Sequence, residues 1–268
     1  MSGQKKNSRN SRNLSENWPR RAPGHVAAAA PTPPVAPTTP AHTRSPTCTD
    51  PNRNYRGDLS NPRNLSDDIP DEANCSTFWT GLPGDCSFKN LFDSMRNIGR
   101  ISHAHISKPA GQYKTAAAKV EFFERESVDK LMAEARAGNV RVAGVIPTIT
   151  LNRVRIAALG DHTDDHRVAQ HGIPSRVLQV IGPRQVVVRE TLEAILAAQN
   201  LEYGLEEVVH VLSAEGNRCL EFRFASYRAQ AARARFLIID QRRNQALTPE
   251  ERALWRKVAI LWGPDPCA

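Results

Sequence analysis

The stretch from residue 76 to residue 123 limits the possible folds most, because two different hydrophobic periods follow one another in it. Thr77–Leu82, Ile101–Ser107 and Ala116–Phe123 are predicted to be β-strands, and in the last of them Ala118, Val120 and Phe122 share one face at a period of two. Between the first two segments, Phe88–Ile98 carries apolar residues every three to four positions, which predicts an amphipathic helix. The order strand, helix, strand, strand places the chain in the α+β class.

Helix and strand signals up to residue 156 complete one module with the segment described above. Ser87 can cap the first helix and Gly99 can end it. A second helix is predicted over Ser127–Ala137 and a fourth strand over Thr148–Val154. The resulting order, β-α-β-β-α-β, is the ferredoxin-like plan, in which two helices cover one face of a four-stranded antiparallel sheet. We expect this module to span residues 73–156.

The same order of elements recurs in residues 175–268, which predicts a second, degenerate module. Its predicted strands and helices are, in chain order, Arg176–Ile181, Arg189–Gln199, Glu207–Leu212, Arg218–Phe224, Tyr227–Arg242 and Lys257–Trp262. A short helix beginning with Pro249 after Thr248 is predicted before the last strand, since proline is favoured in the first helical turn. Residues 157–174, which are polar and net acidic, are predicted to link the modules.

Residues 1–72 are predicted to be a disordered tail. Ala27–Ala41 is an alanine, proline and threonine tract that cannot bury enough apolar surface to offset its chain entropy. The pairs Lys5-Lys6 and Arg20-Arg21 could act as a nuclear-localisation or RNA-tethering arm, the alternative being a solvated tail.

Charge and cysteine content narrow the function class. The formal net charge is +8, and residues 73–156 carry 12 Lys and Arg against 7 Asp and Glu, which weakly favours an anionic partner such as nucleic acid. The five cysteines form no C-x-x-C motif, so neither a disulfide framework nor a zinc site is indicated, and a nuclear or cytoplasmic location is expected. No apolar run approaches the ~20 residues of a membrane span.

No catalytic or cofactor-binding pattern is present. The sequence has no dinucleotide-binding glycine motif, no P-loop and no nucleophile-elbow motif, so we expect neither an enzyme nor a cofactor. Acidic and histidine residues do gather between residues 161 and 171, namely Asp161, His162, Asp164, Asp165, His166 and His171. Because this cluster falls in the predicted linker and lacks a helix or strand to hold it, a metal site is not expected.

Two segments resemble the signature motifs of the RNA-recognition-motif (RRM) family. Thr77–Leu82 (TFWTGL) resembles the family's hexamer, and Pro83 follows it. Thr115–Phe122 (TAAAKVEF) resembles the family's octamer at its fourth place and at its Val-x-Phe end. From Ala73 to Ala268 the chain is similar to filamentous-fungal proteins with two RRM-like modules and an Asp-Pro-Cys end like Asp265–Cys267 here.

The resemblance implies which residues would bind single-stranded RNA. RRM proteins stack bases on rings from the hexamer and octamer, and Phe78 occupies the hexamer ring position. The octamer ring positions hold Ala117 and Lys119, of which Lys119 could contact a phosphate or a base edge. His103 and His105 should lie on the same exposed sheet face, where they could stack or form hydrogen bonds, or else be ordinary surface histidines.

Tyr113 and Lys114, in the predicted loop Lys108–Lys114, could clamp a nucleotide at the sheet edge. In the second module the residues expected to face outward on the third strand are Cys219, Glu221 and Arg223, none of them aromatic. Its long helix carries Arg228, Arg235 and Arg242 at seven-residue intervals, a pattern more typical of a solvated helix face.

Two functions are therefore expected from the sequence. The first is an RNA-binding protein that contacts single-stranded RNA through the sheet of its first module. The alternative is a protein–protein adaptor that uses RRM folds without RNA, with possible protein partners on the second module.

Overall fold

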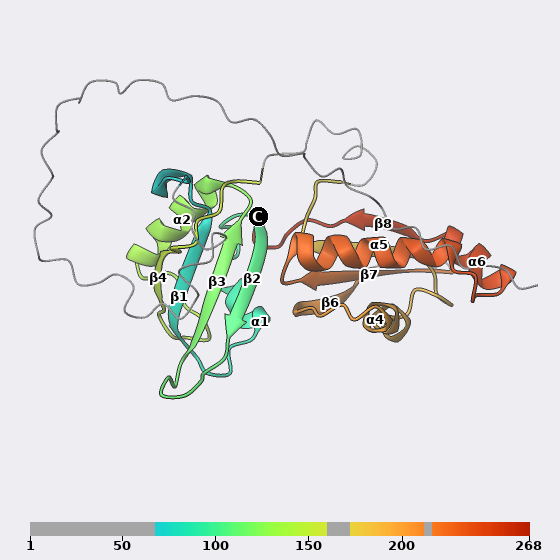
Figure 1. Cartoon of the computed structure of the whole chain (residues 1–268), viewed down its shortest axis with the longest axis horizontal. Coiled ribbons are helices and arrows are strands. Elements are labelled where there is room, and N and C mark those ends of the chain that lie inside the picture. Colours follow the sequence, from blue (N-terminus) through green and yellow to red (C-terminus); the bar gives the residue numbers. More distant parts are fainter. Residues whose placement is uncertain (1–67, 160–171, 212–215) are drawn as a thin grey trace, which may run out of the picture. The chain divides into compact units, whose positions relative to one another are not determined.

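The computed structural model describes residues 68–159, 172–211 and 216–268 and contains two four-stranded antiparallel sheets (Figure 1). The strand order is β2-β3-β1-β4 in the first sheet and β6-β7-β5-β8 in the second, which is the same order twice. The chain thus has the predicted α+β fold of two RRM-type, ferredoxin-like modules. Residues 1–67 of the predicted tail and most of the predicted linker, with its acidic and histidine cluster, lie outside the described residues.

The elements of the first module are β1 (Ser76–Leu82), α1 (Phe88–Asp93), β2 (Ile101–Ser107), β3 (Ala116–Phe122), α2 (Arg125–Arg136) and β4 (Thr148–Leu151). A short 3-10 helix, Asp71–Ala73, precedes them, and Arg155 forms an ion pair with Asp71 at 3.0 Å. The first element therefore begins two residues before Ala73, the predicted start of the first module.

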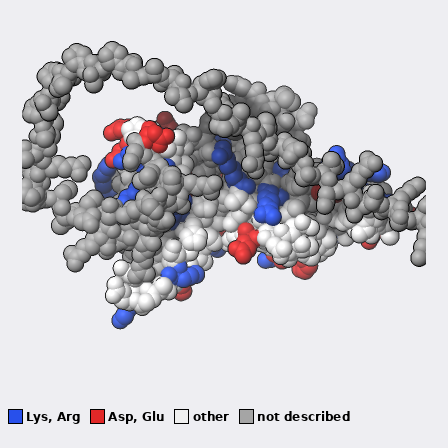
Figure 2. Space-filling model, in the orientation of Figure 1, with Lys and Arg blue, Asp and Glu red and all other residues white. Residues whose placement is uncertain are grey.

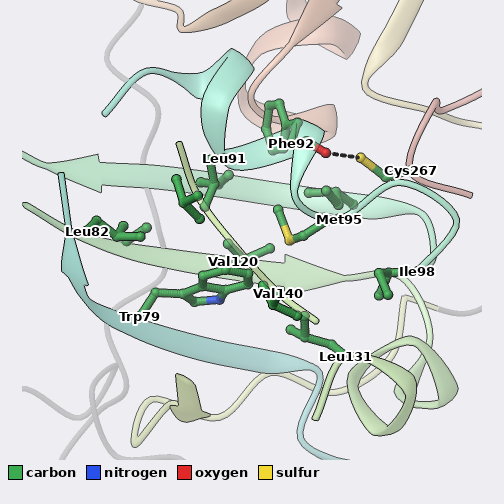
Figure 3. Packing of buried hydrophobic residues seen from close by; sticks show 14 of the residues in the cluster. Trp79, Leu82, Leu91, Phe92, Met95, Ile98, Val120, Leu131, Val140 and Cys267 are labelled. Atoms are coloured by element: carbon green, nitrogen blue, oxygen red, sulfur yellow. Dashed lines mark hydrogen bonds between the residues drawn. The ribbon is translucent and has the colours of Figure 1, made fainter. Parts of the chain in front are cut away.

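A single core lies between the first sheet and its helices (Figure 3). Trp79 of β1 is fully buried and packs in one cluster with Leu91 of α1, Val120 of β3 and Leu131 of α2. The indole Nε1 donates a hydrogen bond to Thr77 Oγ1 at 3.0 Å, so the polar atom of this buried ring has a partner. Because successive strand residues point to opposite faces, burial of Trp79 sends its neighbours on β1 outward.

The first helix is shorter than predicted and ends at Asp93 instead of Ile98. Beyond it the chain forms tighter turns, in which Met95 N donates to Phe92 O at 3.0 Å and Ile98 N donates to Met95 O at 3.2 Å. These i→i+3 bonds replace the α-helical pattern but leave Met95 and Ile98 in the core. The N-terminus of α1 is capped by Ser87, as predicted, and the Ser87 side chain accepts from Asn90 N in a capping box.

The elements of the second module are β5 (Val177–Pro183), α4 (Arg189–Ala198), β6 (Leu205–Val211), β7 (Asn217–Phe224), η4 (Tyr227–Ala231), α5 (Ala232–Asp240), η5 (Gln241–Arg243), α6 (Pro249–Arg256) and β8 (Ala259–Trp262). The core of this module joins Phe222 and Phe224 of β7 to Leu192 and Leu196 of α4. The helix predicted over residues 227–242 is divided, because it begins as a π-helical turn and ends as a 3-10 turn.

The inserted helix α6 begins as predicted, with Pro249 in its first turn after Thr248. Thr248 Oγ1 accepts from Glu251 N at 3.2 Å, and the Glu251 carboxylate accepts from Thr248 N at 2.8 Å. Lys257 caps the C-terminus of this helix in a helical conformation, so β8 starts at Ala259 and not at Lys257.

The last residues of the chain contact elements of both modules. Asp265 accepts hydrogen bonds from Ile101 N of β2 at 2.9 Å and from Arg176, just before β5, at 2.8 and 3.1 Å. Cys267 Sγ donates to Phe92 O of α1 at 3.5 Å (Figure 3). Arg176 is fully buried and also pairs with Glu206 of β6 at 2.8 Å.

Candidate nucleic-acid interface

Four side chains form one row across the exposed face of the first sheet. The strand register places His105 of β2 opposite Lys119 of β3, Lys119 opposite Phe78 of β1, and Phe78 opposite Thr150 of β4. Phe78 is 39% exposed, whereas the adjacent Trp79 is fully buried. The row therefore offers one accessible ring with a cation and an imidazole on the same side of it.

A second row lies two residues farther along the strands. His103 of β2 stands opposite Glu121 of β3, and Glu121 stands opposite Ser76 of β1. His103 is half-buried, and burial is the main cause that lowers the pKa of its imidazole below the ordinary value, with Lys119 and His105 acting in the same direction and Glu121 against it.

The outer edge of β2 is covered by the chain itself. Ala104 N donates to Ala225 O at 2.8 Å, and His103 forms a β-bridge with Ser226. This contact explains why His103 is less exposed than His105, which lies two residues farther along β2 on the same face.

Lys119 is paired within the face. Its Nζ lies 2.7 Å from Glu121 Oε1, and Glu121 was not identified from the sequence as a site residue. The signal was present, because residues two apart on a strand share a face and Lys119 and Glu121 are two apart. A carboxylate beside the lysine weakens its attraction for a phosphate and adds hydrogen-bond acceptors to the face.

Ala117 lies on the same exposed face as Lys119 and is opposite Ser107 of β2. Neither side chain has a ring, so neither can stack a base. Beside it β1 departs from regular pairing between Trp79 and Leu82, where Gly81 adopts a φ of 75°.

Tyr113 and Lys114 lie in the loop between β2 and β3 and not in the row. Tyr113 is 45% exposed, and its backbone N–H donates to Ala110 O at 3.2 Å in a turn. Three strand positions separate Lys119 from Ala116, the first residue of β3 after this loop, which is roughly 10 Å along β3. The structure thus brings together Phe78, His105 and Lys119 and leaves the loop pair at the end of the sheet.

The corresponding face of the second sheet is polar at its centre. Cys219 and Glu221 face outward by register but are buried, contrary to the expectation of exposed positions. Glu221 accepts from Gln179 Nε2 at 2.8 Å and pairs with Arg223 at 2.8 Å. Aliphatic residues of the neighbouring strands lie around this network: Ile181, Val209, Val211 and Leu261.

The arginines of the long helix do not form a uniformly solvated stripe. Arg228 is exposed, but Arg235 is half-buried over the Trp262 ring at 5.7 Å, and Arg242 donates to Val258 O. Two of the three cations are therefore engaged within the second module. Figure 2 shows basic and acidic side chains interspersed on the face that it draws, so charge does not single out one basic surface there.

No protein-family model matches the chain, and no curated protein matches it. Among solved structures, it is similar to the first two RRM domains of the yeast poly(U)-binding protein Pub1, with 16% identity, 71% of this chain and 99% of that chain covered, and a TM-score of 0.25. The RNA-recognition domains 1 and 2 of Sex-lethal from Drosophila melanogaster match with 14% identity, 71% and 100% coverage and a TM-score of 0.22. The RNA-binding domain of Hrp1 in complex with RNA matches with 15% identity, 72% and 98% coverage and a TM-score of 0.24.

These scores are too low to support an argument about function, so the fold assignment rests on the strand order and register. Within residues 68–159, 172–211 and 216–268, no group of three or more His, Cys, Asp or Glu is placed to hold a metal ion. The same residues contain no helix that is both long and apolar enough to cross a lipid bilayer.

Proposed function

We propose that this chain is an RNA-binding protein whose first module contacts single-stranded RNA through the exposed face of its first sheet. The observation that carries the proposal is the row of His105, Lys119 and Phe78 on three adjacent strands. A base can stack on the Phe78 ring while the lysine and the imidazole meet a phosphate or a base edge. We retain the predicted division into a tail (1–72), a first module (73–156), a linker (157–174) and a degenerate second module (175–268), and a nuclear or cytoplasmic location.

The face predicts modest affinity. A base stacked on an aromatic ring contributes ~1–3 kcal/mol, and two of the usual three ring positions hold Ala117 and Lys119. Much of the remaining attraction is then electrostatic, so binding should weaken as salt is added. The loop residues Tyr113 and Lys114 would contact the strand of RNA beyond the stacked base.

Fluorescence-anisotropy titration of the whole chain against a random single-stranded RNA tests the proposal. The double variant Phe78→Ala with Lys119→Ala should bind at least tenfold more weakly than wild type, since a stack and a cation are lost together. The matched control is Phe236→Ala with Lys89→Ala, because Phe236 is 66% exposed on α5 and Lys89 is an exposed α1 cation. If wild type binds no better than the Phe78 and Lys119 double variant, the sheet does not bind RNA.

The second candidate is a protein–protein adaptor, favoured by the aliphatic residues on the outer face of the second sheet, of which Val211 is 39% exposed. Such a face has no ring to stack a base but can bury apolar side chains of a protein. Affinity capture with and without RNase separates the two candidates. Partners that persist after RNase and are lost on Val211→Asp support the adaptor, and partners lost on RNase treatment alone contradict it.

A further inference from the structure

An acidic side chain is out of place on a surface that only attracts phosphates. Glu121 lies on the same face of the first sheet as Lys119, one position before the end of β3, and its carboxylate pairs with Lys119 at 2.7 Å. Only 13% of the Glu121 side chain and 32% of the Lys119 side chain are exposed, so both ends are held close to the sheet. A held cation and carboxylate, side by side, form a defined pattern of donors and acceptors.

The pair lies within reach of a base on Phe78. Lys119 is directly opposite Phe78 in the register, and Glu121 is the diagonal neighbour two positions along β3. Direct neighbours on a sheet face have Cβ atoms ~5 Å apart and diagonal neighbours ~7–8 Å apart, within the span of long side chains. A base stacked on the ring would therefore present one of its edges to Lys119 and Glu121.

Guanine is the base whose edge matches this pattern. Its O6 is an acceptor for the lysine, and the adjacent N1–H and N2–H2 groups are donors for the two oxygens of the carboxylate. Adenine and cytosine carry an amino donor where guanine has O6, which opposes the lysine. Uracil has an acceptor and a donor in the first two places, but its O2 would face the carboxylate.

We propose that Lys119 and Glu121 together recognise the Watson–Crick edge of a guanine stacked on Phe78, which makes Glu121 a specificity-determining residue. The inference rests on the proposed RNA-binding function. His103 and His105 of β2 stand opposite Glu121 and Lys119, so each member of the pair is also flanked by an imidazole. The charge of the carboxylate repels RNA and lowers affinity in general. Hydrogen bonds from guanine N1–H and N2–H2 to the carboxylate offset this repulsion.

The test uses the whole chain and four short labelled single-stranded RNAs that differ only at one central base in a uridine-rich frame. Wild type should bind the guanine probe about tenfold or more tightly than the adenine probe. A fifth probe with inosine, which keeps O6 and N1–H but lacks the N2 amino group, should bind with intermediate affinity. Glu121→Gln should reduce the guanine-to-adenine ratio several-fold without weakening the adenine probe, because the carboxylate that accepts from N1–H and N2–H2 is lost and a repulsive charge is removed. The preference that remains comes from Lys119 and guanine O6.

Glu126→Gln is the matched control, since Glu126 is exposed on α2 and away from the sheet face. Thermal unfolding confirms that each variant is folded. Equal binding of all probes that still depends on Phe78 overturns the guanine inference and leaves the proposed function standing. A guanine preference that Glu121→Gln leaves undiminished also overturns it, whereas absence of binding to every probe overturns both proposals.

Discussion

At the scale of single residues, the register of β1 decides which side chains reach the exposed face of the first sheet. Thr77 and Trp79 point to the core and Phe78 outward, because the strand period is two and only one register buries the indole. The half-burial of His103 was not predictable, since it depends on Ala225 and Ser226, more than a hundred positions away in the chain. The same period of two places Glu121 on the face of Lys119, although Glu121 was not predicted to be a site residue.

The half-buried imidazole of His103 predicts a pH dependence of stability. The unfolded chain protonates this residue near the ordinary pKa of ~6.5, and the folded chain does so only at lower pH, since burial lowers the pKa. Between these values the unfolded state binds more protons, so the free energy of unfolding falls as the pH drops below ~6.5 and is restored above it. His103→Gln should flatten this slope in urea unfolding measured from pH 7.5 to pH 5.

The control is His210→Gln on β6, which removes a histidine from the second sheet and leaves His103 in place. A slope that is unchanged by His103→Gln, or equally reduced by His210→Gln, would contradict the assignment to His103.

At the scale of elements, the hydrophobic periods located the strands and the longer helices of both modules, whereas α6 was located by its Thr-Pro start and the 3-10 helix Asp71–Ala73 was not predicted. The ends of several elements depended on local hydrogen bonds. The range Ile101–Ser107 agrees residue for residue, because both ends of that strand are marked by turns. The helix over residues 227–242 begins instead as a π-helical turn, in which Ala231 N donates to Ser226 O at 3.0 Å. Its start is fixed next to Ala225, whose carbonyl accepts from β2, and such a contact leaves no periodic signal.

The start of α6 at Pro249 after Thr248 was predicted from the sequence, and the structure adds a capping box there whose energetic weight can be measured. Thr248→Ala removes the oxygen that accepts from Glu251 N, so we expect a loss of about 1 kcal/mol in the free energy of unfolding. Urea unfolding followed by circular dichroism measures it. Thr191→Ala, at an exposed position of α4, is the control and should be close to neutral. Equal midpoints for the two variants would show that the cap contributes nothing.

At the scale of the whole molecule, the described residues beyond the N-terminal segment belong to one compact unit, and the Asp-Pro-Cys end takes part in it. Asp265–Cys267 formed part of the resemblance to fungal RRM-like proteins, but no sequence pattern indicated which residues they contact. The contact from Asp265 to Ile101 spans 164 positions, and no local pattern encodes a contact at that separation. Arg176 was predicted as the first strand residue of the second module, whereas it is a buried cation that Asp265 and Glu206 neutralise.

Asp265 should therefore be needed to hold this part of the fold together. Asp265→Ala leaves the buried Arg176 guanidinium with half of its charge partners and the Ile101 N–H without an acceptor. Removing one member of a buried ion pair typically costs ~3–5 kcal/mol, so we expect a loss of that order in urea unfolding. Asp129→Ala is the control, because its pair with Arg125 is exposed and such pairs contribute at most ~1 kcal/mol.

Release of the C-terminal end should also be visible at Cys267. Burial raises the pKa of this thiol to about 12, which keeps it protonated and unreactive in the wild type. Once exposed, the thiol returns toward its ordinary pKa, and its reaction with a thiol reagent at pH 8 should accelerate by roughly two powers of ten. The measurement uses a Cys48→Ser background, so that every remaining cysteine lies among the described residues. Of these, Cys75, Cys86 and Cys219 are buried, and a faster reaction reports on Cys267. An Asp265→Ala variant that is as stable and as unreactive as Asp129→Ala would show that the C-terminal end is held by its backbone contacts and not by the carboxylate.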